Sequence, residues 1–266
     1  MRGDGIANVS PVNPFMQAGE DYARHRPTYP HELVQALAEV CGGSGHAVDV
    51  GCGTGQLSTS LAAVFAKVTA IDPSESQIAN AKAHPRIQYR VGTAEHIEAP
   101  DCGADLVVAA QAAHWFDLDR FYAEACRILR PGGALALVTY GVPSLDGPAA
   151  ERFDRFYWRD IHQYWPEERR HVESGYKTLP FPFDETTLPE LSIIRDWTFD
   201  ELSAYIGTWS AVQVARAAGA SELVSSALAE IAAGWGEDNK HRIIWPIRAR
   251  VAIAPEYHGV RQGGEF

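Results

Sequence analysis

Cysteine, basic charge and long apolar runs are all scarce in this chain of 266 residues. The cysteines, Cys41, Cys52, Cys102 and Cys126, form no C-x-x-C pair, which argues against a zinc site or a disulfide framework and indicates a reducing compartment. Acidic residues outnumber basic ones by 34 to 23, and the net charge of −11 disfavours a nucleic-acid partner. No apolar run reaches membrane-spanning length, and the N-terminus, with Asp4 and no apolar segment, lacks a signal-peptide pattern. We therefore expect a soluble, cytoplasmic protein that binds neither membrane nor nucleic acid.

A glycine-rich run from Val48 to Gly55, between an apolar stretch and an amphipathic helical pattern, is the most informative feature present. Gly51, Gly53 and Gly55 permit a tight turn and close approach of a ligand to the backbone. The start of the following helix offers unpaired N–H groups to a polar ligand. The run predicts a binding site for the nucleoside part of a cofactor.

Two acidic residues indicate which kind of cofactor this site favours. A dinucleotide fold places a third glycine where this chain has Gln56, and Asp49 brings a carboxylate close to where a pyrophosphate would lie. A cationic ligand suits the site better. Asp72 closes a second apolar run, near the spacing of about 20 residues at which an acidic side chain binds a ribose.

Two further motifs follow in order, Gly92-Thr93-Ala94-Glu95 and Leu129-Arg130-Pro131-Gly132-Gly133. With the acid, the glycine turn and the second acid, they make the first half of the chain resemble the class I S-adenosylmethionine-dependent methyltransferases. The resemblance implies S-adenosylmethionine as cofactor and Gly92–Glu95 as a loop on its adenine side. The cofactor-binding residues that we expect are Tyr22, Arg26, Asp49, Gly51, Cys52, Gly53, Thr54, Gly55, Asp72, Pro73, Gln77, Thr93, Ala94, Glu95, Gln111 and Ala112.

Alternation of apolar runs with helical periodicity predicts an α/β fold, a parallel sheet covered by helices on both faces. With the resemblance, we expect a doubly wound, Rossmann-like mixed sheet of seven strands with a helical, aromatic-rich cap. The expected strands are 47–50, 68–71, 87–91, 105–109 and 134–138, with 191–197 and 243–253 as an antiparallel pair. The expected organisation is an N-terminal arm and first helix (1–45), a cofactor-binding core (46–142), a helical cap (143–187) and the completion of the sheet (188–266).

Helix boundaries follow from smaller signals. Leu57, Leu61, Val64 and Phe65 have the spacing of one buried helix face. After Asp72, Ser74 and Gln77 are in capping-box relation and open a helix that would bury Ile78 and Ala81. Asp117 or Asp119 would cap the helix that ends near Pro131.

The catalytic candidates, His114 and Trp115, follow the fourth expected strand, where ligands of open α/β sheets bind. His114 would orient an acceptor carboxylate or act as general base for a hydroxyl, because an unperturbed histidine pKa of about 6.5 lies near neutral pH. The alternatives are an ordinary loop histidine and a tryptophan that packs on the next helix.

The stretch Tyr22-Ala23-Arg24-His25-Arg26-Pro27-Thr28-Tyr29-Pro30 is expected to form a lid, with Arg26 bound to the methionyl carboxylate of the cofactor or to an acidic acceptor. Together with Ala112-Ala113-His114-Trp115-Phe116-Asp117 and Gly207-Thr208-Trp209-Ser210, it is similar to the trans-aconitate methyltransferase-like (methyltransferase type 11) branch. That branch implies methyl transfer to a small organic acid.

Nine aromatic residues lie between Asp146 and Phe183, where they would form a buried cap core or enclose a sulfonium or an apolar acceptor. Arg159, Arg169 and Arg170 are available there for a carboxylate, or are solvated. The histidines show no metal-binding spacing, so no metal is expected.

We conclude from the sequence that the protein is an S-adenosylmethionine-dependent methyltransferase that methylates a small-molecule carboxylate or hydroxyl by in-line displacement. The alternatives are a cofactor-binding protein that performs no methylation, an enzyme of S-adenosylmethionine-dependent rearrangement and, less favoured, a nicotinamide-dependent oxidoreductase. The chain is expected to be a monomer or a homodimer.

Overall fold

The computed structural model of the chain describes residues 26–236 and 240–255. Its strands are β1 (His46–Val50), β2 (Lys67–Asp72), β3 (Ile87–Val91), β4 (Ala104–Ala110), β5 (Leu129–Tyr140), β6 (Ser144–Leu145), β7 (Glu185–Thr186), β8 (Leu191–Trp197) and β9 (His241–Ile253). Its helices are α2 (His31–Val40), α3 (Gln56–Leu61), α4 (Glu75–Ala79), α5 (Leu118–Ile128), α6 (Ala149–Arg155), α7 (Arg169–Glu173), α8 (Phe199–Gly207), α9 (Ser210–Ala217) and α10 (Ser221–Trp235). Short helical turns are η2 (Ala113–Trp115), η3 (Phe156–Asp160) and η4 (His162–Tyr164).

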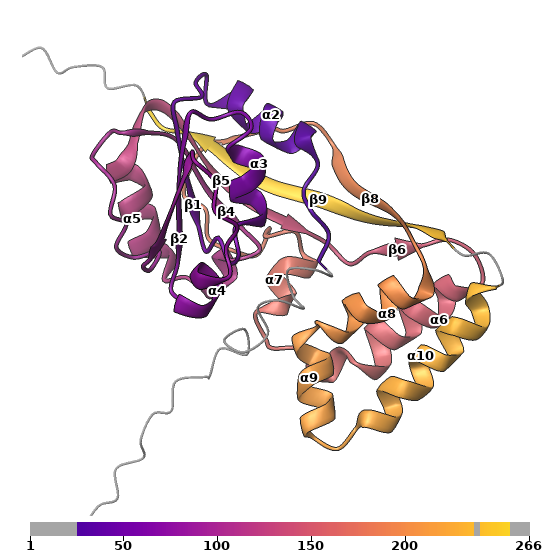
Figure 1. Cartoon of the computed structure of the whole chain (residues 1–266). Helices are drawn as coiled ribbons and strands as arrows, with labels where there is room; N and C mark the ends of the chain where they lie inside the picture. Colours follow the sequence, from indigo (N-terminus) through magenta and orange to yellow (C-terminus); the bar gives the residue numbers. More distant parts are fainter. Residues whose placement is uncertain (1–25, 237–239, 256–266) are drawn as a thin grey trace, which may run out of the picture.

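A single mixed sheet organises the fold, in the strand order β3-β2-β1-β4-β5-β9-β6 (Figure 1). Strands β1 to β5 pair in parallel, while β6, β7 and β8 pair antiparallel to β9 and β9 pairs antiparallel to β5. The described chain thus contains the seven expected strands, including the antiparallel pair β8 and β9, and two additional strands of two residues each. The α/β fold and its mixed sheet are confirmed.

The chain reverses its direction of travel across the sheet between β1 and β4. Strands β2 and β3 lie on one side of β1, and β4 and β5 lie on the other. The connections that leave β1 and β4 therefore diverge, which opens a crevice at the carboxyl ends of these strands. Figure 1 shows α2 and α3 on one side of the parallel strands and α5 on the other.

Alternate residues of the strands pack into two hydrophobic cores, one on each face of the sheet. Leu106 and Val108 of β4 join Leu61 of α3 in the first core, whereas Val107 joins Phe121 of α5 in the second. Because side chains alternate across a strand, an apolar run such as β4 can be buried on both faces.

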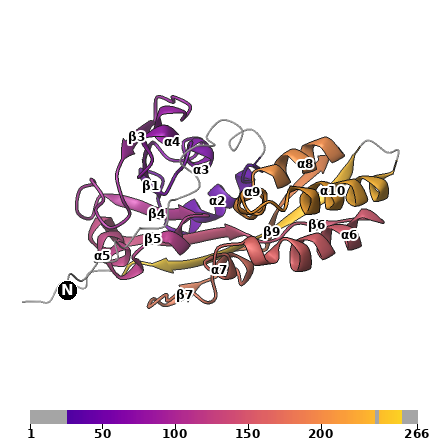
Figure 2. The same cartoon turned by 90° about the horizontal axis from the view of Figure 1, so that it is seen from below.

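Helices α6, α8, α9 and α10 pack into a group beyond the end of the parallel strands (Figures 1 and 2). This group draws α6 from the range expected to form the cap (143–187) and the other three helices from the range expected to complete the sheet (188–266). Helices α8 to α10 are inserted between the paired strands β8 and β9.

Three aromatic side chains of the cap segment lie in the core of this helical group. Phe153, Phe156 and Tyr157 are fully buried and pack around the ring of Trp209. Trp165 also contacts the Trp209 ring, with ring centroids 5.6 Å apart, but it lines the cleft described below. The sequence allowed two roles for these aromatic residues, a buried core or the enclosure of a ligand. In the structure, some of them form the core and Trp165 lines the cleft.

Local signals place the helix starts well and the helix lengths less well. Asp117 caps α5 by accepting a hydrogen bond from the Arg120 N–H, and Ser74 caps α4 in the same way through Gln77. Helix α4 has only five residues and buries Gln77 rather than Ile78. A helix this short presents little apolar face, so its position depends on its neighbours.

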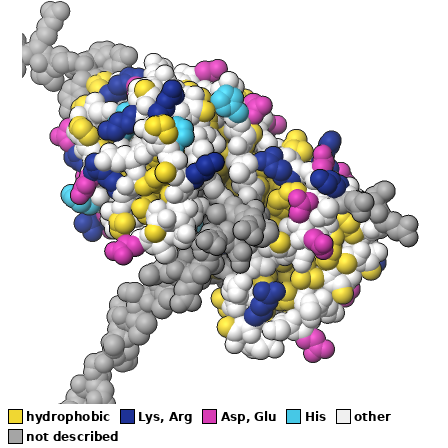
Figure 3. All heavy atoms as spheres, in the orientation of Figure 1, with side chains coloured by type: hydrophobic (Ala, Val, Ile, Leu, Met, Phe, Trp, Pro, Cys, Tyr) yellow, Lys and Arg dark blue, Asp and Glu magenta, His cyan; other side chains and the backbone are white. Residues whose placement is uncertain are grey.

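On the face shown in Figure 3, acidic and basic side chains are interspersed. None of the described helices is long and apolar enough to cross a bilayer. The described residues also contain no cluster of three or more His, Cys, Asp or Glu side chains suited to a metal ion.

Candidate functional site

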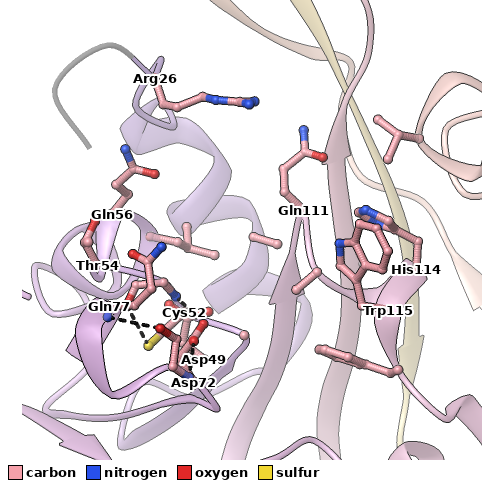
Figure 4. Close-up of a pocket in the computed structure, with 18 of the residues that line it drawn as sticks. Arg26, Asp49, Cys52, Thr54, Gln56, Asp72, Gln77, Gln111, His114 and Trp115 are labelled. Carbon is pink, nitrogen blue, oxygen red and sulfur yellow. Dashed lines mark hydrogen bonds between the residues drawn. The ribbon is translucent and has the colours of Figure 1, made fainter. Parts of the chain in front are cut away.

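A cleft opens at the carboxyl ends of β1, β2 and β4, and α7 and the first residue of α9 contribute to its far wall (Figure 4). It holds about 1340 Å³ of space unfilled by atoms, part of it open to solvent. The expected site residues that line it are Arg26, Asp49, Gly51, Cys52, Gly53, Thr54, Asp72, Pro73, Gln77, Gln111, Ala112, His114 and Trp115.

Four expected residues do not line this cleft. Gly55 instead packs against Tyr89. Ala94 is buried in the core beneath α5, and Glu95 accepts a hydrogen bond from the Asp117 N–H. Thr93 forms an isolated bridge with His96. This loop supports the neighbouring segments instead of facing the cleft. Tyr22 lies outside the described residues.

The cleft lining also includes residues that were not among the expected catalytic or cofactor-binding residues: Tyr29, Gln56, Leu57, Ser74, Ala110, Phe116, Tyr140, Trp165, Pro166, Arg169, Val172 and Ser210. Several adjoin expected residues and could have been found by extending each motif by one or two positions. Tyr140 lies outside the motifs, so only tertiary packing identifies it. Ser210 ends the Gly207–Ser210 motif, and Arg169 is one of the three arginines that the sequence offered for a carboxylate.

The glycine turn adopts backbone angles that strongly favour glycine. Gly51 and Gly53 have φ angles of +71° and +56°. The backbone N–H groups of Gly51 and Cys52 donate to the Ile71 carbonyl at 2.8 and 3.0 Å, which ties the turn to the end of β2. A Cβ at Gly51 would lie 2.4 Å from the Ala112 Cβ. The turn therefore packs directly against the segment that follows β4.

Asp72 joins the glycine turn to the start of α4. One carboxylate oxygen accepts from the Gly53 N–H at 2.8 Å and the other from the Ser74 N–H at 2.9 Å. Burial raises the pKa of this carboxyl, and the two N–H donors oppose that effect. Each oxygen retains a further lone pair, so the carboxylate is held in place and can still accept from a ligand in the cleft.

Asp49 presents the clearest sign of a missing ligand contact. Its side chain is 1% exposed; Oδ2 accepts from the Ser58 hydroxyl at 2.5 Å, and Oδ1 has no hydrogen-bond partner among the described residues. A buried acceptor without a partner is costly to the fold. Because Asp49 lines the cleft, a cationic or hydrogen-donating ligand would satisfy this atom. The carboxylates of Asp49 and Asp72 therefore fit the sulfonium cofactor that the sequence predicts.

Binding of S-adenosylmethionine is expected to tighten as the pH rises toward 7. Burial, with the charge of Asp72 adding to it, raises the pKa of the Asp49 carboxyl to about 7. Below that pH the free protein holds a neutral acid, which must lose its proton to meet a cation. The dissociation constant should fall by up to about tenfold per pH unit between pH 5.5 and 7 and level off above.

Calorimetry in buffers of different ionisation enthalpy would measure this proton release directly. The Asp49→Asn variant serves as the control, since its amide cannot titrate and the pH slope should vanish. A wild-type affinity that is flat or that weakens with rising pH would contradict the role given to Asp49.

Gln111 marks the start of the other half of the cleft. It is not glycine, yet its φ is +57°, a strained conformation that is enriched at functional sites. Both polar atoms of its side-chain amide are hydrogen-bonded: Oε1 accepts from the Thr139 hydroxyl and Nε2 donates to the Tyr140 carbonyl, each at 3.0 Å. Figure 4 shows Gln111 between the cofactor-side residues and His114.

His114 and Trp115 lie on the short helix η2 at this end of the cleft (Figure 4). His114 Nδ1 is 2.9 Å from the Tyr176 hydroxyl. Burial, and then the positive charge of Arg169, lowers the pKa of His114 to about 3. The imidazole is thus neutral at physiological pH and a weak base, which favours the orienting role over general base catalysis. Trp115 is 42% exposed and lies beside the His114 ring, so it is not buried against the next helix.

Two arginines reach the cleft from outside the core. The Nη atoms of Arg26 donate to the Tyr140 hydroxyl at 3.3 Å and the Thr208 carbonyl at 3.5 Å, which links the N-terminal segment to the helical group. Arg169 enters from α7. Arg159 and Arg170, which the sequence grouped with Arg169, do not line the cleft.

Comparison with known proteins assigns the family. Residues 48–137 match the family described as methyltransferase domain. A Dictyostelium discoideum protein named as a methyltransferase is 34% identical over 200 residues, covering 74% of this chain and 76% of that one. A malonyl-[acyl-carrier protein] O-methyltransferase of Methylococcus capsulatus is 36% identical over 145 residues, half of each chain. A solved structure described as a type II methyltransferase from Anaeromyxobacter dehalogenans is 44% identical, with a TM-score of 0.82 over 87% of this chain and 99% of that one. The glycine turn between its two acids, the mixed sheet and these relatives together show that the chain belongs to the class I methyltransferases.

Proposed function

We propose that this protein transfers a methyl group from S-adenosylmethionine to an oxygen atom of a small molecule. The observation that carries the proposal is the buried Oδ1 of Asp49, which has no hydrogen-bond partner in the described part of the chain and belongs to a residue that lines the same cleft as Asp72. A buried acceptor beside a glycine turn suits the positively charged methionyl part, and the Asp72 carboxylate suits the ribose hydroxyls.

The remaining residues divide the cleft between cofactor and acceptor. Arg26 would bind the methionyl carboxylate, and Pro73 and Gln77 would flank the nucleoside. The bound cofactor supplies a methyl group made electrophilic by the positive sulfur. Gln111 and His114 would orient the acceptor oxygen for methyl transfer, and such positioning accounts for much of the rate of a displacement reaction.

An oxygen acceptor, and a carboxylate in particular, matches the chemistry of His114. A carboxylate is already a nucleophile and needs no base, whereas a hydroxyl must lose a proton that a histidine with a pKa of about 3 accepts poorly. The O-methylation recorded in the name of the Methylococcus relative supports an oxygen acceptor. The sequence resemblance to the trans-aconitate methyltransferase-like branch points to a small organic acid.

A nicotinamide cofactor fits the site less well. Gln56 opens helix α3 and lines the cleft at the position where the dinucleotide motif requires glycine. Asp49 would place a carboxylate near a pyrophosphate, and like charges repel. A protein that binds S-adenosylmethionine without methylating an acceptor would use the same pocket, and it would show tight binding with no turnover.

Calorimetric titration with S-adenosylmethionine and S-adenosylhomocysteine, with NADH as control, tests the proposal. We expect micromolar binding of the first two ligands and none of NADH. Binding would justify assays of small organic acids with radiolabelled cofactor. Failure of both sulfur ligands to bind would overturn the proposal, and binding of NADH alone would favour the oxidoreductase.

A further inference from the structure

One cationic side chain of the acceptor half lies outside the sequence motifs described above. Arg169 begins helix α7, lines the cleft and is only 16% exposed. Its neighbour Arg170 is 60% exposed and pairs with Glu167, and Arg159 is exposed. The structure thus selects one arginine of the cap segment as a cleft residue.

The guanidinium of Arg169 is held on one edge and along one face. Nε donates to the Tyr157 hydroxyl at 2.8 Å, and that hydroxyl in turn donates to Glu173 at 2.8 Å. The guanidinium carbon lies 4.4 Å from the centre of the Trp165 ring. These contacts fix the plane of the fork before any ligand binds, which lowers the entropy cost of forming a two-pronged hydrogen bond.

The outer donors of the fork have no partner on the protein. Within residues 26–236 and 240–255, neither Nη atom of Arg169 donates a hydrogen bond, and the nearest carboxylate, Glu173, is 3.9 Å from Nε. Glu173 is shared with Tyr157 and with His162 at 3.5 Å. It therefore balances the charge of Arg169 without occupying the Nη edge, which is the edge that binds a carboxylate.

Arg169 lies near the candidate catalytic histidine. Helix α7 packs against η2, which carries His114, and Figure 1 shows α7 between the sheet and the helical group. The Arg169 charge contributes to keeping His114 neutral. One end of the cleft thus combines a fixed, partly buried cation with a neutral imidazole, and none of the described residues that line this end carries a carboxylate.

We propose that Arg169 binds the carboxylate of an acidic methyl acceptor and sets the specificity of the cleft for such acceptors. This inference deepens the proposed function and rests on it for its catalytic consequence. A guanidinium fork matches the two oxygens of a carboxylate, whereas an amide or ester of the same shape offers one acceptor and no charge. Acidic acceptors are retained on this basis and neutral analogues are rejected.

The test titrates small acids into protein saturated with S-adenosylhomocysteine, and it needs no turnover. The probes are benzoate, adipate and octanoate, each compared with its matched amide. At least one acid should bind where its amide does not. Arg169→Gln should weaken that acid by about 10- to 100-fold, the range that one lost charged hydrogen bond predicts. Arg169→Lys should recover part of the loss, because it keeps the charge and loses the fork.

Two controls separate this inference from misfolding and from the proposed function. Arg169→Gln should bind S-adenosylhomocysteine within about twofold of wild type, which shows that the variant folds, and Arg170→Gln should bind the acid as wild type does. For an acid that is turned over, Arg169→Gln should raise KM more than it lowers kcat.

Three outcomes would overturn the inference: acids and amides that bind equally, no binding by any probe acid, or acid binding that survives Arg169→Gln. If wild type fails to bind S-adenosylhomocysteine at all, the proposed function fails together with the inference. If it binds the cofactor product but no acid, the inference alone fails.

Discussion

Replacing Asp72 with alanine is expected to weaken the binding of S-adenosylmethionine about 100-fold. A charged hydrogen bond contributes roughly 1.5–3 kcal/mol, so losing one or two to the ribose gives a factor of ten or more. The side chain also holds the Gly53 and Ser74 N–H groups, and without it the turn and the start of α4 lose a shared acceptor. Asp72→Ala therefore loses both the hydrogen bonds to the ribose and the fixed backbone geometry of the binding site.

Calorimetry on Asp72→Ala and Asp72→Asn would separate these two contributions. Asparagine keeps one acceptor oxygen but loses the charge, so it should bind with intermediate affinity. Asp196→Ala removes an exposed carboxylate far along the chain, on β8, and should leave cofactor binding unchanged. An unaltered dissociation constant in Asp72→Ala would remove Asp72 from the site.

Replacing Gly51 with alanine is expected to lower the free energy of unfolding by about 3 kcal/mol. The φ of +71° costs a residue with a Cβ about 1–2 kcal/mol. The new methyl would also lie 2.4 Å from the Ala112 Cβ, and such overpacking typically costs a further 1–3 kcal/mol. Ala112 has no flexible side chain that could move away, so the backbone must shift and the cleft must distort.

Gly53→Ala is the matched control for this change. Its φ of +56° imposes a similar conformational cost, but the nearest atom to a new Cβ is 3.9 Å away. We expect a loss of about 1 kcal/mol, measured by urea unfolding of both variants beside wild type. Equal losses in the two variants would show that the contact between Gly51 and Ala112 contributes nothing.

Several features of the fold could be predicted because they depend on neighbouring residues. The strands around the glycine turn are apolar runs, and their ends are marked by Asp49, Asp72 and the glycines themselves. The helix caps at Ser74 and Asp117 form with backbone groups three residues away. Local signals of this kind made the strands and the glycine turn predictable, although the strands pair with partners far along the chain.

The half of the cleft that would bind the methyl acceptor could be predicted only in part from the sequence. The sequence placed His114 at the end of a strand, but its weak basicity depends on burial and on Arg169, 55 positions further along the chain. The sequence also grouped three arginines that the structure separates, and it placed Thr93, Ala94 and Glu95 beside a ligand although they do not line the cleft. Side-chain direction on a short helix or loop depends on the surfaces against which it packs.

By itself, the sequence determined the α/β class, the positions of the principal strands along the chain and the acid–glycine–acid pattern of the proposed cofactor site. Only the tertiary structure decided that α6 packs with α8 to α10, that Gln111 adopts a left-handed conformation, and that Arg169 and Tyr140 face the cleft. The physical reason is the range of the interactions. Turns and caps form through contacts within a few residues, and a strand is recognisable from its own apolar run, whereas an acceptor pocket is assembled by packing between segments that are far apart in the chain.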